Sequence, residues 1–428
     1  MVEAQPLMPR REERMMKSRE QELDLVALPS DQDASGRTFG ASELEALARV
    51  VGRGILVSTK GPEVKSFEGR FASLLGAAHG IASSSGSAAV HAALAAVDPE
   101  PGDEIVTTAV TDMGAITPIL YQGAVPAFAD IDPSTCNVTA ESVEAAITSR
   151  TRAVIVTHLF GQPCDLDGIS AVARRHGVSI IEDCAQAPLA TSRGRFVGTI
   201  GEYGAFSFQQ GKHITCGEGG ITLTNDAAAA RRIYLWVNKG YGYGNEKPDH
   251  DFIALNSRMT ELQGAFLGAQ LDKIQAVVHA RRRTADLMSE FLADIEGVGL
   301  PTARPGDVHS YWKYALTIDP AVVPGGPVRV AQELRALGVP SAPRYIQKPA
   351  FQCTIFTEQR TFGTSRWPFT LAQPSALDYS RGRFPGTFEA LDRILVLPWN
   401  EKYDERHIEF LGEAVRRSIV AAQLGASE

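Results

Sequence analysis

Apolar, β-branched runs alternate with segments of helical spacing over the first two thirds of the chain. Residues 87–97 and 166–176 repeat Ala, Val, Leu and Ile at the spacing of a helix. Strand-like runs lie between and after them, at residues 105–108, 153–157, 178–181, 205–208 and 221–224. The alternation is typical of β-α-β units and predicts an α/β fold with a mostly parallel sheet flanked by helices.

A different pattern begins near residue 258. Residues 258–296 are rich in Leu, Ala, Gln, Glu and Arg and end before Gly and Pro breakers, which predicts one long helix leaving the large domain. Residues 351–385 contain prolines, glycines and scattered aromatics and are expected to be loop-like. The other elements expected here are a strand at 314–318 and helices at 328–337 and 405–421.

These segments divide the chain into three parts. Residues 1–38 are an N-terminal extension, in which the mixed-charge run at residues 10–14 favours a solvated tail or short arm. Residues 39–271 are expected to form the large α/β domain. Residues 272–428 are expected to form the long connecting helix and a smaller α+β domain.

The composition disfavours several classes of protein. A chain of 428 residues with 44% hydrophobic and 21% charged residues can bury a large core without disulfides or metal ions. The net charge of -8 disfavours a nucleic acid or an anionic membrane as partner, because both attract positive surfaces. No stretch of about 18 uncharged apolar residues is found, so no membrane span is expected. Five widely spaced cysteines without a C-x-x-C pair favour a reducing cytoplasm.

The segment around Lys212 carries the strongest chemical signal. Lysines are usually exposed charges. This one follows an apolar strand and precedes Gly217, Gly219 and Gly220, which let the backbone pass close to a ligand. A lysine held near a cofactor, with its charge disfavoured by burial, can act as a Schiff-base nucleophile.

Further segments offer groups to a cofactor. Asp183 ends a predicted strand, on the side where open α/β sheets bind ligands, and could hold a protonated pyridine nitrogen. It could equally cap a helix. Gly86 and Ser87 lie in a turn that opens a helix, which is either a phosphate site or a capped helix without ligand. Ser207 offers one more hydroxyl.

Competing motifs are absent from the sequence. The G-x-G-x-x-G, P-loop and H-E-x-x-H patterns do not occur. A dinucleotide dehydrogenase, a P-loop NTPase and a zinc hydrolase therefore lose support, and no metal site is expected.

Seven segments in one order carry a family resemblance. They are SGSAA at 85–89, GAVPAFADID at 123–132, HLFGQP at 158–163, EDCAQA at 182–187, FSFQQGK at 206–212, GEGG at 217–220 and NSRMTELQ at 256–263. The chain resembles the DegT/DnrJ/EryC1/StrS family of sugar aminotransferases, which are fold-type I pyridoxal phosphate enzymes. The resemblance runs from about residue 39 to the C-terminus and is weak over residues 351–385.

The resemblance implies a role for each matching residue. Lys212 would form a Schiff base with pyridoxal phosphate and then shuttle a proton between the cofactor and the substrate carbon. Asp183 would hold the pyridine nitrogen, and Gln186 would lie near the ring hydroxyl. The residues implied to hold the phosphate are Gly86, Ser87, Ser207 and, from the neighbouring subunit, Asn256. The last of these roles implies a homodimer with active sites at the interface.

The sequence departs from the family pattern at residues 111–114. Many members place a Phe or Trp there, which stacks on the cofactor ring, whereas this chain has Thr-Asp-Met-Gly. Either Met113 packs on the ring through its polarizable thioether, or the contact comes from elsewhere. Lys212 favours amine transfer, because members that remove a hydroxyl tend to carry His at that position.

The implied reaction moves an amine from glutamate or glutamine to a keto-sugar or keto-cyclitol, for an amino sugar, an aminocyclitol antibiotic or a surface glycan. The run at residues 209–212 is similar to that of aminotransferases acting on keto-inositols. Arg344, Tyr345 and Lys348 stand where the family often contacts the substrate, or they form an exposed cluster. His158 is either a cofactor-side residue or a satisfied histidine at a strand end.

Three alternative functions stay open. The first is a nucleotide-sugar aminotransferase of the same family, acting on a 3- or 4-keto-hexose. The second is a pyridoxal phosphate-dependent sugar dehydratase. The third is a protein that binds the cofactor or a sugar as a regulator without turnover.

Overall fold

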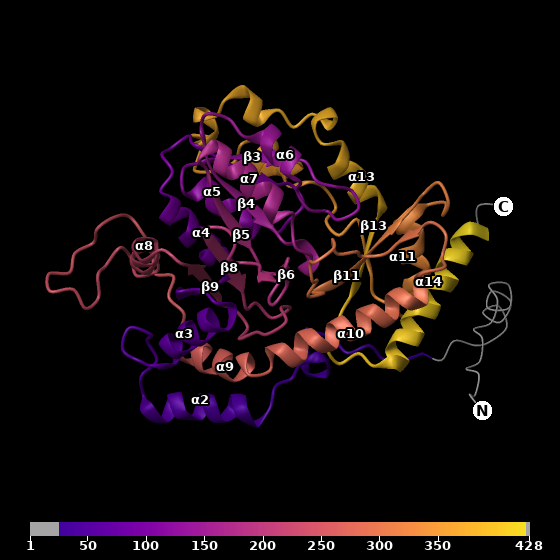
Figure 1. Cartoon of the computed structure of the whole chain (residues 1–428), viewed down its shortest axis with the longest axis horizontal. Coiled ribbons are helices and arrows are strands. Elements are labelled where there is room, and N and C mark those ends of the chain that lie inside the picture. The colour runs from indigo at the N-terminus through magenta and orange to yellow at the C-terminus, as the bar shows by residue number, and fades with distance from the viewer. Residues whose placement is uncertain (1–24, 425–428) are drawn as a thin grey trace.

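A seven-stranded sheet forms the centre of the larger body of the protein, with strand order β1-β9-β8-β5-β4-β2-β3 (Figure 1). The computed structural model describes residues 25–424, so the mixed-charge run at residues 10–14 lies outside the described residues. The strands are β1 (His79–Ser83), β2 (Glu104–Thr108), β3 (Val125–Ala129), β4 (Thr151–Thr157), β5 (Ser179–Asp183), β8 (Tyr203–Ser207) and β9 (Gly220–Thr224). Within this sheet only β9 runs antiparallel to its neighbours, which confirms the mostly parallel α/β architecture.

Alternate residues of the central strands face two separate apolar clusters. In β4, Ala153 and Ile155 join the cluster that contains α4, α5 and α8, whereas Val154 and Val156 join the cluster that contains α3 and α7. Successive side chains of a strand point to opposite faces, so a continuous apolar run buries both sides of the sheet. The helices of this body are α2 (Ala41–Arg53), α3 (Glu63–Leu75), α4 (Gly86–Val97), α5 (Thr117–Tyr121), α6 (Ala140–Ala146), α7 (Leu166–His176) and α8 (Ala227–Val237).

The prediction of a single long helix at residues 258–296 is wrong. Two helices stand there, α9 (Glu261–Leu271) and α10 (Ile274–Leu292). At the break, the Lys273 N–H donates to the carbonyl three residues before it, as in a tighter helical turn. The Lys273 amine in turn donates to the Glu43 carboxylate of α2 at 2.6 Å. No Gly or Pro lies at the break, so no local breaker in the sequence marks it.

A second body is built on a four-stranded antiparallel sheet with strand order β10-β11-β13-β12. Helices α11 (Gly326–Ala336) and α14 (Glu405–Leu424) pack on it together with α10, around a shared apolar core (Figure 1). The expected strand at 314–318 and helices at 328–337 and 405–421 are confirmed. The strands are β10 (Val298–Gly299), β11 (Lys313–Ile318), β12 (Ala342–Pro343) and β13 (Ile394–Pro398).

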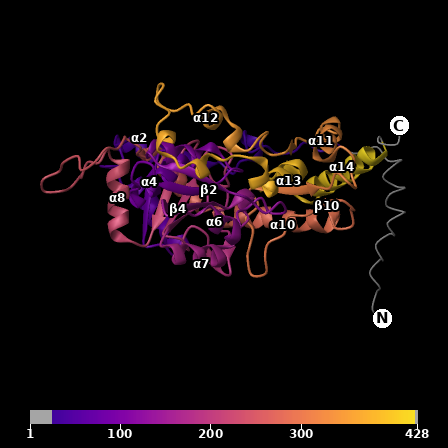
Figure 2. The same ribbon diagram turned by 90° about the horizontal axis from the view of Figure 1, so that it is seen from above.

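Residues 350–388 leave this second sheet and pack on the larger body. Phe351, Phe356 and Phe369 form an aromatic cluster with Phe128 of β3. The segment is irregular, as expected, and α12 lies on the side of the molecule opposite α7 (Figure 2). Its short elements are η4 (Ala350–Gln352), α12 (Thr354–Thr357), η5 (Phe369–Leu371), η6 (Pro374–Leu377), η7 (Arg381–Arg383) and the start of α13 (Pro385–Arg393).

A long connection between α8 and α9 extends away from the larger body (Figure 1). It carries two exposed apolar side chains, Ile253 (98% exposed) and Leu255 (74% exposed). Among the described residues, no helix combines the length and the apolar character that a membrane crossing requires.

Candidate active site

Three parallel strands bring polar residues to one edge of the large sheet. Strands β4, β5 and β8 end at Thr157, Asp183 and Ser207, and Thr157 pairs with Asp183 in the strand register. Carboxyl ends of parallel strands meet at one edge, so these side chains surround a common space. The loop of residues 208–219, between β8 and β9, carries Lys212 to the same space.

The Lys212 side chain is half-buried beside an indole. Its amine lies 4.3 Å from the centroid of the Trp312 ring. Burial lowers the pKa of Lys212 to about 8, against the opposing effect of the Asp183 and Asp112 carboxylates. A substantial fraction of the amine is therefore neutral near physiological pH, which is the form that attacks a carbonyl carbon.

Asp183 is buried at the end of β5, with both carboxylate oxygens near a donor. The Ala185 N–H donates to Oδ1 at 3.0 Å, and the Thr157 hydroxyl lies 3.4 Å from Oδ2. Turns follow Asp183 in the chain, so the alternative that it caps a helix is wrong. Burial raises the pKa of Asp183, and the Ala185 N–H and the Lys212 cation oppose that rise. Such an acid is suited to a pyridine N–H.

His158 lies next to Asp183 but faces the protein interior. The Cys164 N–H donates to Nδ1 at 3.0 Å, so the ring hydrogen is on Nε2, which lies 3.1 Å from the Glu182 carboxylate. The His158 backbone N–H donates to the Asp183 carbonyl at 3.1 Å. Both ring nitrogens thus have a partner within the protein and the ring is fully buried, which favours the satisfied histidine over a cofactor-side residue.

Glu182 completes the same buried cluster. Its carboxylate accepts the N–H groups of Gly198, Ile200 and Gly201 at 2.7 Å each. Together with His158 and Cys184 it forms a group whose ligand atoms lie within 4.8 Å of one another. Because the His158 and Glu182 atoms already bond within the protein, the group serves to fix the end of β5 rather than to hold an ion.

The first turn of α4 lies against Ser207. A Cβ at position 86 would stand 2.6 Å from the Ser207 Cβ, so only Gly86 lets the helix start approach the end of β8. The Ser85 side chain caps the helix by accepting from the Ala88 N–H. The hydroxyl of Ser87 faces Gly114, on the loop that carries Met113. Free N–H groups at the start of a twelve-residue helix, beside two hydroxyls, suit a phosphate.

Gln186 links two chain segments at the edge of the site. Its Oε1 accepts the Phe160 N–H at 2.7 Å, and its Nε2 lies 3.4 Å from the Tyr345 hydroxyl. The rings of Phe160 and Tyr345 are 4.8 Å apart. Burial raises the pKa of Tyr345 to about 12, so the phenol stays protonated. Tyr345 therefore joins the site that Gln186 borders.

Three of the candidate residues lie apart from this group within the described chain. Arg344 donates to Asp392 of α13 at 2.5 Å, and Lys348 is exposed without a contact to the site. Asn256 is exposed on the connection between α8 and α9. Met113, in η2 (Met113–Ala115), packs against the aromatic cluster of residues 350–388, while its neighbour Gly114 faces Ser87.

Three residues near Lys212 are not among the candidates that the sequence predicts. Asp112 stands in the run that departs from the family pattern, and its charge acts on both Lys212 and Asp183. Trp312 and Lys313 lie about a hundred residues further along the chain, where no local motif marks them. Only the packing of β11 against the Lys212 loop brings them together.

The residues present fit pyridoxal phosphate. The start of α4 offers backbone N–H groups beside the Ser87 and Ser207 hydroxyls, a set of donors that suits an anion. Asp183 offers a buried acid, and Lys212 offers a buried amine of lowered pKa. Phosphate, pyridine nitrogen and aldehyde of that cofactor each have a chemically matched group in one space.

Comparison with known proteins agrees with this site. The profile of the DegT/DnrJ/EryC1/StrS aminotransferase family matches residues 38–377. A UDP-N-acetyl-3-dehydro-alpha-D-glucosamine 3-aminotransferase of Acidithiobacillus ferrooxidans is 32% identical over 360 residues, 84% of this chain and 89% of that protein. An L-glutamine:2-deoxy-scyllo-inosose aminotransferase of Streptomyces kanamyceticus is 37% identical over 71% of this chain and 74% of its own.

Solved structures give the same result. An aminotransferase from Psychrobacter cryohalolentis superposes with a TM-score of 0.80 at 28% identity, covering 90% of this chain and 98% of its own. A 3-amino-5-hydroxybenzoic acid synthase superposes with a TM-score of 0.81 at 25% identity, covering 94% and 100%. The chain therefore belongs to the DegT/DnrJ/EryC1/StrS family and is a fold-type I, pyridoxal phosphate-dependent aminotransferase.

Proposed function

We propose that this aminotransferase moves an amino group from glutamate or glutamine to the ketone of a sugar or a cyclitol. Relatives named for a keto-glucosamine derivative and for scyllo-inosose support this substrate class. A further relative, 34% identical, is a spore coat polysaccharide biosynthesis protein of Bacillus subtilis, which supports a role in making an aminated glycan or natural product. A nucleotide-linked keto-hexose is the alternative substrate within the same class.

The observation that carries the proposal is the position of Lys212 beside the Asp183 carboxylate in one buried space. When bound, pyridoxal phosphate supplies an electron sink for the carbanion formed at the amine-bearing carbon. Lys212 would hold the cofactor, and its amine would move a proton between the substrate carbon and Nζ. Asp183 would accept a hydrogen bond from the pyridine N–H.

The start of α4 is assigned to the phosphate. Gly86 and Ser87 contribute N–H groups there, and Ser207 contributes its hydroxyl. Gln186 is assigned to the side of the ring hydroxyl, with Tyr345 next to it toward the substrate. Arg344 and Lys348 stay secondary candidates for the substrate, since Arg344 is held by Asp392.

A homodimer completes the site in this proposal. Asn256 is exposed, and it follows the exposed side chains of Ile253 and Leu255 on the same connection. Helix α2 also presents apolar side chains to solvent, at Leu44 and Val51. A second copy that covers these surfaces would receive Asn256 at its phosphate. The five cysteines, none of them in a disulfide, fit action in the cytoplasm.

The experiment is a screen of keto-sugars and keto-cyclitols against the pyridoxamine form of the enzyme, with recovery of cofactor absorbance as the readout. Product mass distinguishes amine transfer from dehydration. Lys212→Ala should abolish the visible band that borohydride fixes to the protein, whereas Lys60→Ala, which removes an exposed lysine, should keep it. A band that persists in Lys212→Ala protein purified without added amine contradicts the assignment. Cofactor loading without transfer to any ketone would favour a binding protein.

A further inference from the structure

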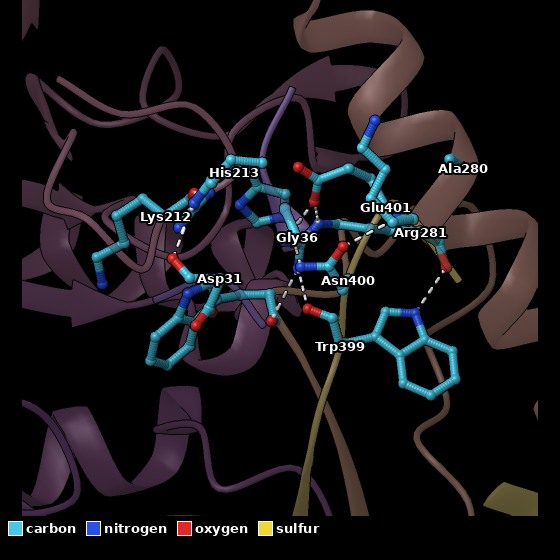
Figure 3. Close-up of polar contacts among 12 residues, drawn as sticks. Asp31, Gly36, Lys212, His213, Ala280, Arg281, Trp399, Asn400 and Glu401 are labelled. Carbon is cyan, nitrogen blue, oxygen red and sulfur yellow. Dashed lines mark hydrogen bonds and ion pairs between the residues drawn. The ribbon is translucent and has the colours of Figure 1, made fainter. Parts of the chain in front are cut away.

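A short segment of the N-terminal extension is fastened to the loop that carries Lys212 (Figure 3). Within residues 31–37, Arg37 is buried, with 5% of the residue exposed. Its guanidinium faces backbone carbonyls. It donates to the carbonyl oxygens of Asp31 and Lys212, at 2.8 Å each, and to that of Gln210. One planar cation thus fixes the backbone on both sides of Gly211, immediately before the reactive side chain.

The same segment is tied to the second body. The Asp31 carboxylate accepts from the Lys313 amine of β11 at 3.0 Å, and its carbonyl accepts from the Gln210 side chain at 3.0 Å. The Gly36 carbonyl, at the end of η1 (Ala34–Gly36), accepts from Asn400 at 3.1 Å (Figure 3). Residues 31–37 therefore connect the Lys212 loop with two positions of the second body, one in β11 and one just after β13.

The amines of Lys212 and Lys313 both lie close to the indole ring of Trp312. The Lys212 amine lies 4.3 Å and the Lys313 amine 5.1 Å from the centroid of the same ring, Trp312. The Trp312 N–H donates to the Gly211 carbonyl at 2.7 Å, so the ring is fixed to the Lys212 loop. The Trp312 side chain therefore separates the Asp31–Lys313 ion pair from the Lys212 amine.

We propose that residues 31–37 are a positioning segment of the active site, in which Arg37 holds the backbone of the Lys212 loop and Asp31 sets the charge beside the Lys212 amine through Lys313. The inference rests on the role proposed above for Lys212. Residues 31–37 of the N-terminal extension thus act on the catalytic site. They do so through Lys212 and its loop, without contact to the substrate.

The sign of the charge effect follows from the groups that face Lys212. Asp183 of β5, Asp112 before η2 and Asp31 favour its ammonium form, and Lys313 disfavours it. Asp31→Asn removes one favourable charge and leaves Lys313 unpaired, so the Lys212 amine should lose its proton more readily. Lys313→Met removes the unfavourable charge, so the amine should hold its proton to higher pH.

The test measures Lys212 itself in cofactor-free, full-length protein. The rate of acetylation of Lys212 by dilute acetic anhydride is followed by mass spectrometry as a function of pH. We expect Asp31→Asn to lower the midpoint by about half a pH unit, a roughly threefold change in the neutral fraction, and Lys313→Met to raise it by a similar amount. The double variant should return toward the wild-type midpoint. Glu45→Gln, which alters an exposed carboxylate of α2 outside the segment, is the matched control.

Arg37 is tested by hydrogen exchange over residues 209–213. Arg37→Gln loses the forked contact with three carbonyls, so exchange in this loop should rise at least severalfold, and Arg37→Lys should restore it only in part. Equal midpoints in all charge variants, or unchanged exchange in Arg37→Gln, overturn the proposal. Neither readout needs the cofactor, so a failure here differs from a failure of the Lys212→Ala test, which concerns the Schiff-base residue alone.

Discussion

The amine of Lys212 lies over the indole of Trp312, 4.3 Å from its centroid, and the indole N–H is anchored on the neighbouring Gly211 carbonyl. The aromatic face is therefore fixed to the loop that carries the reactive lysine. An indole in this position stabilises the ammonium form of the amine without adding a negative charge.

Replacing the indole should change the protonation of Lys212. In cofactor-free protein, Trp312→Leu removes the aromatic face and should lower the pKa of Lys212 by about half a unit or more, the size of a partly desolvated cation–π contact. Trp312→Phe keeps an aromatic ring face and should lower the pKa of Lys212 less, although it loses the hydrogen bond to the Gly211 carbonyl. Acetylation midpoints measured by mass spectrometry check the order, and equal values for all three proteins would refute it.

The stability of the cofactor-free protein should rise between about pH 8 and pH 10.5. Burial lowers the pKa of Lys212 from 10.5 to about 8, so in this window the unfolded chain binds a proton that the folded chain does not. Raising the pH removes that proton and favours the folded state. Lys212→Met should lack this contribution. The measurement is the difference in melting temperature between wild type and Lys212→Met at pH 7.5 and 9.5, and a constant difference would count against it.

Gly86→Ala should weaken cofactor binding rather than destroy the fold. The added Cβ would lie 2.6 Å from the Ser207 Cβ, so the start of α4 must move away from the end of β8 and the phosphate contacts loosen. We expect the dissociation constant of pyridoxal phosphate to rise about tenfold or more, or about 1.4 kcal/mol. Gly69→Ala in α3 has open space around its Cβ and should instead stabilise the protein by about 0.5–1 kcal/mol. Equilibrium titration of both variants, with their melting curves, tests the contrast.

His158→Gln should affect stability more than substrate binding. The ring is fully buried between the Cys164 N–H and the Glu182 carboxylate, and losing these bonds should cost about 1–3 kcal/mol. Because His158 does not face the substrate, KM for the ketone should stay within about twofold of wild type. Chemical denaturation and steady-state kinetics measure the two quantities. A large rise in KM with unchanged stability would return His158 to the substrate site.

The large sheet could be predicted because its strands bury both faces. Val154 and Ile155 occupy opposite faces of β4, and such runs are legible in sequence as continuous apolar segments. The division of the helix at Lys273 could not be predicted, because no local breaker marks it. The Lys273 amine at this break contacts the Glu43 carboxylate, 230 residues away in the sequence.

The residues of the candidate site likewise fall into those that the sequence predicts and those that only the folded structure places there. Asp183, Ser207 and Gly86 stand at the ends of their own elements, so local pattern and resemblance place them. Trp312 and Asp31 reach Lys212 only through tertiary packing, and nothing in their neighbouring residues indicates it. The sequence leaves the role of His158 open, because that role depends on the orientation of its ring. The Cys164 N–H and the Glu182 carboxylate fix this orientation, and both reach the ring only in the folded chain.

The aromatic segment at residues 350–388 makes the chain pass between the two bodies three times. α10 leads out of the larger body, the residues after β12 lead back to Phe128, and α13 leads out again to β13. Neither body is therefore a contiguous piece of sequence. Chimeras that recombine substrate preferences of related enzymes at a single junction near residue 271 would place Phe128 against a foreign aromatic partner. A working exchange must carry residues 350–388 together with the larger body.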